Sequence, residues 1–218
     1  MQLKSFEFNP IAENTYVLWD DSRECVIIDA GCFFPDECRT LQSFIEHEGL
    51  TVKHLLCTHF HFDHVFGVRF VETTWGVRCA AHPADSWWEA NNAAVCASFG
   101  LRFLGEPPVI GTPLADGDVI RFGLGTTLRC IHLPGHSPGG IAFYDEDDGV
   151  AFVGDSLFAA GGMGRTDLHG GDYAELMRSL RTRLFTLPDS TVIYPGHGPS
   201  TTLRTERWSH NLSSFPPK

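Results

Sequence analysis

The chain has few positive charges and no long apolar run. Its 218 residues include 16 lysines and arginines against 27 aspartates and glutamates, which gives a formal net charge of −11. An acidic surface repels nucleic acids and anionic membranes, so we expect neither as a partner. No stretch approaches the roughly 18 apolar residues of a membrane helix, and Met1–Ser5 lacks the apolar core of a secretory signal. We therefore expect a soluble, cytoplasmic protein.

Cysteine is present without the spacing of a disulfide framework. The seven cysteines are odd in number, and none of them forms a C-x-x-C pair. Such a set favours reduced thiols, several of them buried in strands, over structural disulfides. The hydrophobic content of 43% is ordinary for a globular protein. The length predicts a single domain that spans residues 1–218.

The most informative stretch is Val52–His64, in which a short apolar run precedes a cluster of metal-binding side chains. His59, His61, Asp63 and His64 are residue types that bind zinc, iron or manganese. Alternate residues just past a strand point the same way, so the first two histidines can bind one ion from one side. The chain must then turn, so that the aspartate and third histidine can face a neighbouring point. The alternative is a surface loop that is rich in histidine by chance, but the position directly after a buried-type strand disfavours it.

Three later stretches repeat one arrangement, in which an apolar strand and a glycine turn precede a single potential ligand. These residues are His136 in Leu133–Gly140, Asp155 after Phe152–Gly154, and His197 in Tyr194–Pro199. Each alone could be a turn or cap residue. Loops at the same sheet edge can converge on one point, so together they predict a shared metal centre. The other histidines are expected on the surface or in the core, with His169 the nearest to the site: His47, His54, His82, His132, His169 and His210.

Apolar periodicity predicts an alternation of strands and helices along the chain. Strands are expected over Leu3–Phe8, Tyr16–Trp19, Cys25–Ile28, Val52–Thr58, Val77–Ala80, Val119–Phe122, Thr127–Leu133, Ile141–Tyr144, Val150–Val153 and Thr191–Tyr194. Helices are expected over Pro35–Gly49, Val65–Trp75, Pro83–Phe99, Tyr173–Phe185 and Thr201–Asn211. No repeat or interdomain linker is evident.

The motifs together resemble those of metallo-β-lactamase-fold hydrolases. They are T-H-x-H-x-D-H at Thr58–His64, P-G-H-S-P-G at Pro134–Gly139, the Gly154–Asp155 pair, and Y-P-G-H-G-P at Tyr194–Pro199. The resemblance spans nearly the whole chain and implies an α/β fold, the αβ/βα four-layer sandwich of two mixed sheets flanked by helices. It also implies the ligand sets: His59, His61 and His136 for one metal, Asp63, His64 and His197 for the second, and Asp155 as the bridge.

Within that superfamily the chain is most similar to short glyoxalase II-like proteins, through Gly164–Leu168, Gly171–Tyr173 and Leu187–Asp189. This implies hydrolysis of S-2-hydroxyacylglutathione or related small thioesters by a hydroxide that bridges two divalent ions, with zinc expected and iron or manganese as alternatives. Full-length glyoxalase II has a C-terminal helical domain that binds glutathione, and we expect no such domain here. Glutathione specificity is therefore expected to be weak.

The same resemblance suggests roles for three further side chains near the centre. Asp63 could also steer or accept a proton, which makes it the candidate catalytic residue. Arg165 and Asp167 could brace the ligand loops, or could form a buried structural ion pair.

The rival enzyme is a persulfide dioxygenase of the same fold, whose single iron would use His59, His136 and Asp155. A β-lactamase is disfavoured because Asp155 stands where a cysteine ligand is usual, and a nuclease is disfavoured by the acidic charge. A metal-binding role without catalysis is the remaining alternative. The sequence does not specify the oligomeric state.

Overall fold

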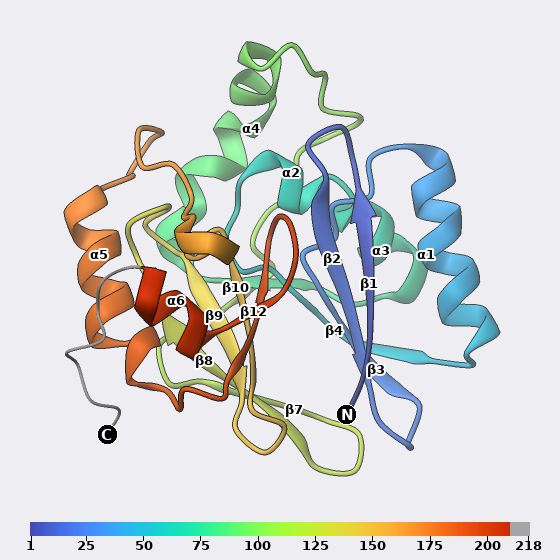
Figure 1. Cartoon of the computed structure of the whole chain (residues 1–218). Helices are drawn as coiled ribbons and strands as arrows, with labels where there is room; N and C mark the ends of the chain where they lie inside the picture. The colour runs from blue at the N-terminus through green and yellow to red at the C-terminus, as the bar shows by residue number, and fades with distance from the viewer. Residues whose placement is uncertain (210–218) are drawn as a thin grey trace.

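The computed structural model of the protein describes residues 1–209 and contains two six-stranded sheets that face each other (Figure 1). The expectations for residues 210–218, including His210, lie outside the described residues. The first sheet consists, in spatial order, of β1 (Gln2–Phe8), β2 (Glu13–Trp19), β3 (Glu24–Ile28), β4 (Thr51–Leu56), β5 (Cys79–Ala81) and β6 (Thr112–Pro113). The second consists of β12 (Thr201–Thr202), β11 (Val192–Pro195), β10 (Val150–Gly154), β9 (Ile141–Asp145), β8 (Thr126–His132) and β7 (Val119–Phe122). Each sheet mixes parallel and antiparallel pairs.

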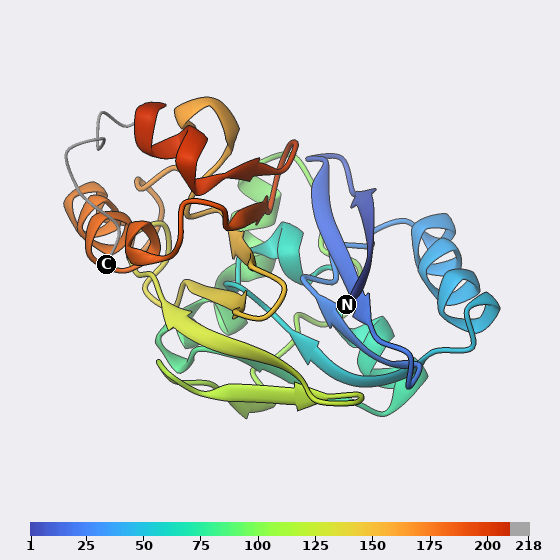
Figure 2. The same cartoon turned by 60° about the horizontal axis from the view of Figure 1, so that its bottom comes forward.

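Helices cover the outer faces of both sheets (Figure 2). Beside the first sheet lie α1 (Pro35–His47), α3 (Val68–Trp75) and α4 (Ser86–Ser98), and beside the second lies α5 (Tyr173–Thr182). The shorter elements are α2 (Phe62–Val65), α6 (Leu203–Ser209), and the 3₁₀ turns η1 (Pro83–Asp85), η2 (Ala159–Gly161) and η3 (Leu184–Thr186). Within residues 1–209, no helix has the length and apolarity needed to cross a bilayer.

The inner strands β2, β3, β9 and β10 are buried on both faces and are correspondingly rich in apolar residues. In β2, Tyr16 and Leu18 join the core between the sheets, whereas Val17 and Trp19 join the core under α1 and α3. A third core lies between β8–β10 and α5. Since successive residues of a strand point to opposite faces, this pattern produces four layers. The predicted αβ/βα sandwich is confirmed.

Some predicted boundaries are wrong, and tertiary contacts explain the main difference. The helix expected over Val65–Trp75 begins only at Val68, and a separate short helix, α2, ends at Val65. Between them the Gly67 amide donates to the Ala30 carbonyl at 2.7 Å. A side chain at residue 67 would also meet that carbonyl, at 2.9 Å from its Cβ. The predicted helix over Tyr173–Phe185 ends at Thr182, and the predicted C-terminal helix begins only after β12.

Candidate metal centre

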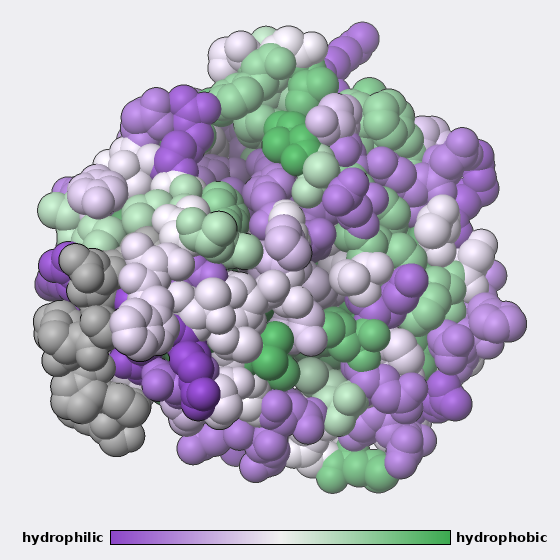
Figure 3. Space-filling view, in the orientation of Figure 1, coloured by the Kyte–Doolittle hydropathy of each residue, from purple (hydrophilic) through white to green (hydrophobic). Residues whose placement is uncertain are grey.

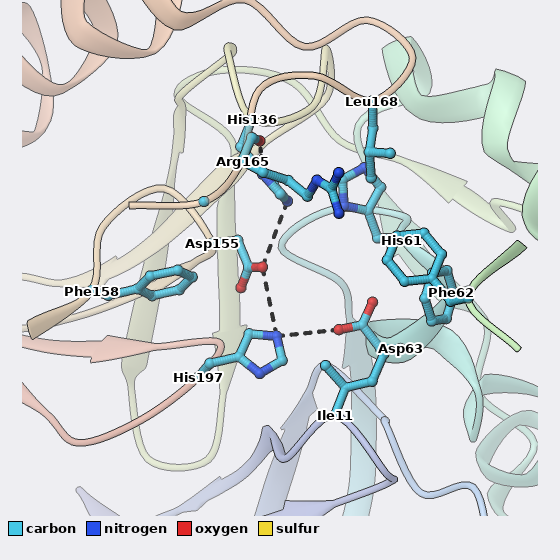
Figure 4. Close-up of a pocket in the computed structure, with 12 residues that line it drawn as sticks. Ile11, His61, Phe62, Asp63, His136, Asp155, Phe158, Arg165, Leu168 and His197 are labelled. Atoms are coloured by element: carbon cyan, nitrogen blue, oxygen red, sulfur yellow. Dashed lines mark hydrogen bonds and ion pairs between the residues drawn. The ribbon is translucent and has the colours of Figure 1, made fainter. Parts of the chain in front are cut away.

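The predicted ligands lie together at one edge of the two sheets (Figure 4). Each comes from the end of a strand or from the helical turn that follows: His59 and His61 after β4, Asp63 and His64 in α2, His136 after β8, Asp155 after β10, and His197 after β11. Strands hold the bases of these loops, so side chains distant in sequence reach one point. The structure therefore brings together every residue that the sequence assigned to the centre.

The ligands form two groups with Asp155 between them. His59, His61 and His136 have ligand atoms within 4.8 Å of one another, and so do Asp63, His64 and His197. Asp155 reaches both groups: its Oδ1 is 3.3 Å from Nε2 of His64, and its Oδ2 is 3.6 Å from Nε2 of both His136 and His197. This is the arrangement that a bridging carboxylate requires. The ligand roles themselves stay a prediction.

Buried polar atoms that face the centre show that the residues fit metal ions. Nε2 of His61 makes no hydrogen bond within the described part of the chain, and the buried Nε2 of His64 and Oδ1 of Asp155 lie 3.3 Å apart as an ion pair without a well-formed hydrogen bond. Leaving such an atom buried and unsatisfied costs about 1–3 kcal/mol. Cations between these nitrogen and oxygen atoms would satisfy them, and this donor set suits zinc, iron or manganese.

Hydrogen bonds to Nδ1 orient the imidazole rings so that Nε2 faces the centre. Nδ1 of His136 lies 2.7 Å from the Arg165 carbonyl oxygen, and Nδ1 of His197 lies 3.1 Å from that of Ala12. Nδ1 of His64 lies 3.0 Å from Oδ2 of Asp29. Partners of this kind fix the tautomer of a metal-binding histidine and restrict rotation of its ring.

Burial and neighbouring charges set the protonation of the centre. Burial, together with the surrounding imidazoles, holds the pKa of His59 and of His61 well below the ordinary value, so both are neutral and able to act as ligands. Burial alone would also lower the pKa of His64, but the carboxylates of Asp63 and Asp155 raise it well above the ordinary value. Burial opposes ionisation of Asp155, yet the neighbouring histidines lower its pKa.

Two glycines allow backbone to pass directly beside the ligands. A Cβ at Gly196 would lie 2.2 Å from Oδ1 of Asp155, and a Cβ at Gly164 would lie 2.5 Å from Nδ1 of His136. Contacts this short exclude any side chain. The glycine-rich loops therefore have a steric role in the centre as well as a conformational one.

Asp29 supports the centre but was not among the predicted site residues. Its carboxylate accepts hydrogen bonds from the Thr58 amide and hydroxyl, both at 2.7 Å, and contacts His64. It also has a positive φ of 52°, an uncommon conformation outside glycine. Asp29 directly follows an apolar strand, as Asp155 does, so the sequence contained a signal for it.

Asp85 connects the two main ligand loops and was missed entirely. Its carboxylate accepts from the Phe60 amide at 3.0 Å, the Ser137 hydroxyl at 3.0 Å and the Gly139 amide at 2.6 Å. Burial raises the pKa of Asp85, against the effect of these hydrogen bonds.

Gly135–Gly139 matches the G-x-S-x-G pattern of serine hydrolases. However, Ser137 is fully buried, and its hydroxyl donates a hydrogen bond to Asp85. Ser137 thus has a structural role.

The two predicted bracing residues form an ion pair that is exposed rather than buried, and their bracing role stays a prediction. The Arg165 side chain forms two hydrogen bonds to Asp167, at 2.6 and 2.8 Å, and this pair is exposed, with 50% and 67% of the side chains accessible. It is therefore not a buried structural pair. Arg165 contacts the ligand His136 through its backbone oxygen. His169 stacks on Trp87 with 3.8 Å between the ring centroids, away from the ligand groups.

Comparisons with known proteins agree with this geometry. The hydroxyacylglutathione hydrolase GloC of Haemophilus influenzae is 35% identical over 217 residues, which cover 96% of this chain and 97% of that protein. The structure of BLEG-1 B3 metallo-β-lactamase superposes with a TM-score of 0.85 at 33% identity, covering 94% of this chain and 96% of that one. The structure of TTHA1623 in a di-iron-bound form superposes with a TM-score of 0.83 at 35% identity, covering 94% of this chain and 98% of that one.

The family profile of the metallo-β-lactamase superfamily matches residues 9–197, which include all of the predicted ligands. The match spans most of the chain, and the structural relatives share the two-sheet sandwich and its helices. The chain belongs to the metallo-β-lactamase superfamily and is a metallo-hydrolase.

Proposed function

We propose that the protein hydrolyses small thioesters, of the S-2-hydroxyacylglutathione type or related to it, at a binuclear metal centre. The observation that carries this proposal is the pair of ligand groups that share Asp155 at the base of a cavity of about 420 Å³. The cavity is of the size that small-molecule substrates occupy. The similarity to a hydroxyacylglutathione hydrolase over nearly the whole chain supports the choice of reaction.

In this proposal His59, His61 and His136 hold one ion, Asp63, His64 and His197 hold the other, and Asp155 contacts both. The ions, when bound, supply Lewis acidity, which lowers the pKa of water from 15.7 to about 7 and polarises a carbonyl group. We propose zinc as the metal. The di-iron-bound form of a protein with 35% identity makes iron the main alternative, with manganese after it.

The side chains of the protein position the reactants and move the proton. Asp63 lines the cavity, and its Oδ2 is 3.2 Å from Nε2 of His197. It is therefore placed to orient the attacking water and to accept a proton from it. In the reaction a C–O bond forms to the acyl carbon, the C–S bond breaks, and a carboxylic acid and a thiol result.

A panel of thioesters tests this proposal. Metal-depleted protein is reloaded with zinc, manganese or iron, and the release of thiol from lactoyl, acetyl and butyryl thioesters is measured. We expect turnover of several members, with metal content and rate rising together. Oxygen uptake with glutathione persulfide and hydrolysis of a chromogenic cephalosporin serve as counter-assays. Failure to hydrolyse any thioester, with activity in either counter-assay, would overturn the proposal.

A further inference from the structure

The cavity over the metal centre has an apolar wall beside His61. Phe62, Phe99 and Leu168 line this wall, and Figure 4 shows Phe62 and Leu168 beside His61. Phe62 is buried, and the centroids of Phe62 and Phe99 are 5.3 Å apart. Phe99 remains 42% exposed at the mouth of the cavity. A large aromatic ring that is rigidly placed but still accessible offers contact area to a ligand at a low entropic cost.

The rest of the lining is apolar or belongs to the ligand groups, apart from Gly164 and one arginine. Ile11 and Phe158 lie on the opposite side, near Asp63 and His197 (Figure 4). In the space-filling view, hydrophobic side chains gather around a recess in the upper half of the molecule (Figure 3). A substrate that enters therefore meets apolar surface before it reaches the ligands.

Arg165 is the only cationic lining residue apart from the histidines of the centre, among the residues the structure describes. Its guanidinium is engaged twice, through two hydrogen bonds to Asp167 and by its position 5.5 Å from the centroid of the Phe99 ring. The carboxylate of Asp167 offsets the charge of Arg165, so an anionic group of a substrate would gain less from pairing with this guanidinium. The wall therefore supplies no free positive charge.

We propose that the wall formed by Phe62, Phe99 and Leu168 binds the acyl group of the thioester and selects apolar acyl chains or rings over hydroxylated ones such as lactoyl. This inference rests on the proposed thioesterase function. Thiol carriers such as glutathione and coenzyme A are polar and anionic, so burying them against this wall would leave their charges unpaired. The apolar part of a thioester that fits the wall is consequently its acyl group.

The expected ratio of kcat/KM between apolar and hydroxylated acyl groups follows from the transfer of apolar surface from water to the wall. Each buried methylene contributes about 0.8 kcal/mol, or roughly a factor of four. Relative to lactoyl, butyryl adds one carbon and phenylacetyl adds five, and the lactoyl hydroxyl would lose its water without finding a partner on the wall. We expect kcat/KM to be at least roughly tenfold higher for the apolar acyl groups, a typical discrimination for an apolar pocket.

The test compares acyl groups on one carrier and carriers with one acyl group. Lactoyl, butyryl and phenylacetyl thioesters of glutathione are assayed with wild type and Phe99→Ala, and the phenylacetyl group is then moved to coenzyme A and N-acetylcysteamine. Phe99→Ala should lower kcat/KM about tenfold for phenylacetyl and less than threefold for lactoyl. The matched control is Phe34→Ala, a phenylalanine of similar exposure that does not line the cavity.

Binding gives a readout that is independent of turnover. S-(2-Phenylethyl)glutathione should bind at least about tenfold more tightly than S-methylglutathione by calorimetry, and Phe99→Ala should remove most of that difference. If thioesters are hydrolysed but lactoyl is preferred, or if selectivity follows the carrier, this inference is overturned while the proposed function stands. If no thioester is hydrolysed, both are overturned.

Discussion

The base of the cavity and its rim are built in opposite ways. At the base, buried polar side chains are fixed by further buried groups, as Asp29 fixes His64. At the rim, the side chains of Phe99 and Arg165 are exposed and contact each other. Changes at the base should therefore reduce activity on every substrate, whereas changes at the rim should alter the ratio between substrates.

The largest expected effect is at Asp155, the residue that contacts both ligand groups. Asp155→Asn removes the negative charge that would offset the repulsion between two cations. We expect metal content to fall and the rate to drop by orders of magnitude for all thioesters together. Elemental analysis beside kinetics tests this, with circular dichroism to confirm folding. A variant that retained both metals and full turnover would show that this residue is not the bridge.

An intermediate effect is expected at Asp85, which connects the two ligand loops without facing the cavity. Asp85→Asn keeps an acceptor oxygen for the Gly139 amide, but its NH₂ group cannot accept from the Phe60 amide or from the Ser137 hydroxyl. We expect metal affinity to fall about 10–100-fold, as for other supporting residues of metal sites, with substrate preference unchanged.

The matched control for that variant is Asp145→Asn. Asp145 is also a buried aspartate with a backbone hydrogen bond, from the Asp148 amide at 3.0 Å, but it lies outside the ligand groups. Its substitution should cost stability and leave metal affinity intact. Equal loss of metal in both variants would mean that Asp85 acts through general stability alone.

The smallest effect is expected for the Arg165 side chain. Arg165→Ala leaves the backbone oxygen that contacts His136, and an exposed ion pair contributes only about 0–1 kcal/mol. Metal content should be unchanged, and kcat/KM for lactoyl thioesters should change by less than about threefold. Arg178→Ala, which removes another exposed ion pair far from the ligand groups, is the control. Loss of metal on Arg165→Ala alone would instead support a bracing role for its side chain.

The sequence identified the clustered side chains of the centre because the signals for them are local. Four potential ligands fall within His59–His64, and each of the others follows an apolar strand and a glycine turn. The supporting residues lack such signals. Asp85 is 25 residues from Phe60 and 52 from Ser137, so its role depends on tertiary contacts that no local pattern encodes. The break between α2 and α3 also depends on a tertiary contact, the hydrogen bond from the Gly67 amide to the Ala30 carbonyl.

The rim was not predictable for the same reason. Phe62 follows a ligand, Phe99 ends α4 and Leu168 lies in the glycine-rich loop, so only the folded chain joins them. The superfamily resemblance supplied the layers and the location of the centre, which depend on the whole set of motifs. It did not supply the wall.

The most direct test of the central claim, a binuclear hydrolase centre, is the replacement of His64. Metal content, thioester hydrolysis and oxygen uptake with persulfide are measured on wild type, on His64→Ala and on the control His82→Ala, whose ring stacks on His132 instead. Wild type and control should hold about two ions per chain and hydrolyse thioesters, while His64→Ala should approach one ion and lose most hydrolysis, because one Lewis acid replaces two. A wild type with one iron, and a His64→Ala variant that keeps it and still consumes oxygen with persulfide, would contradict the account.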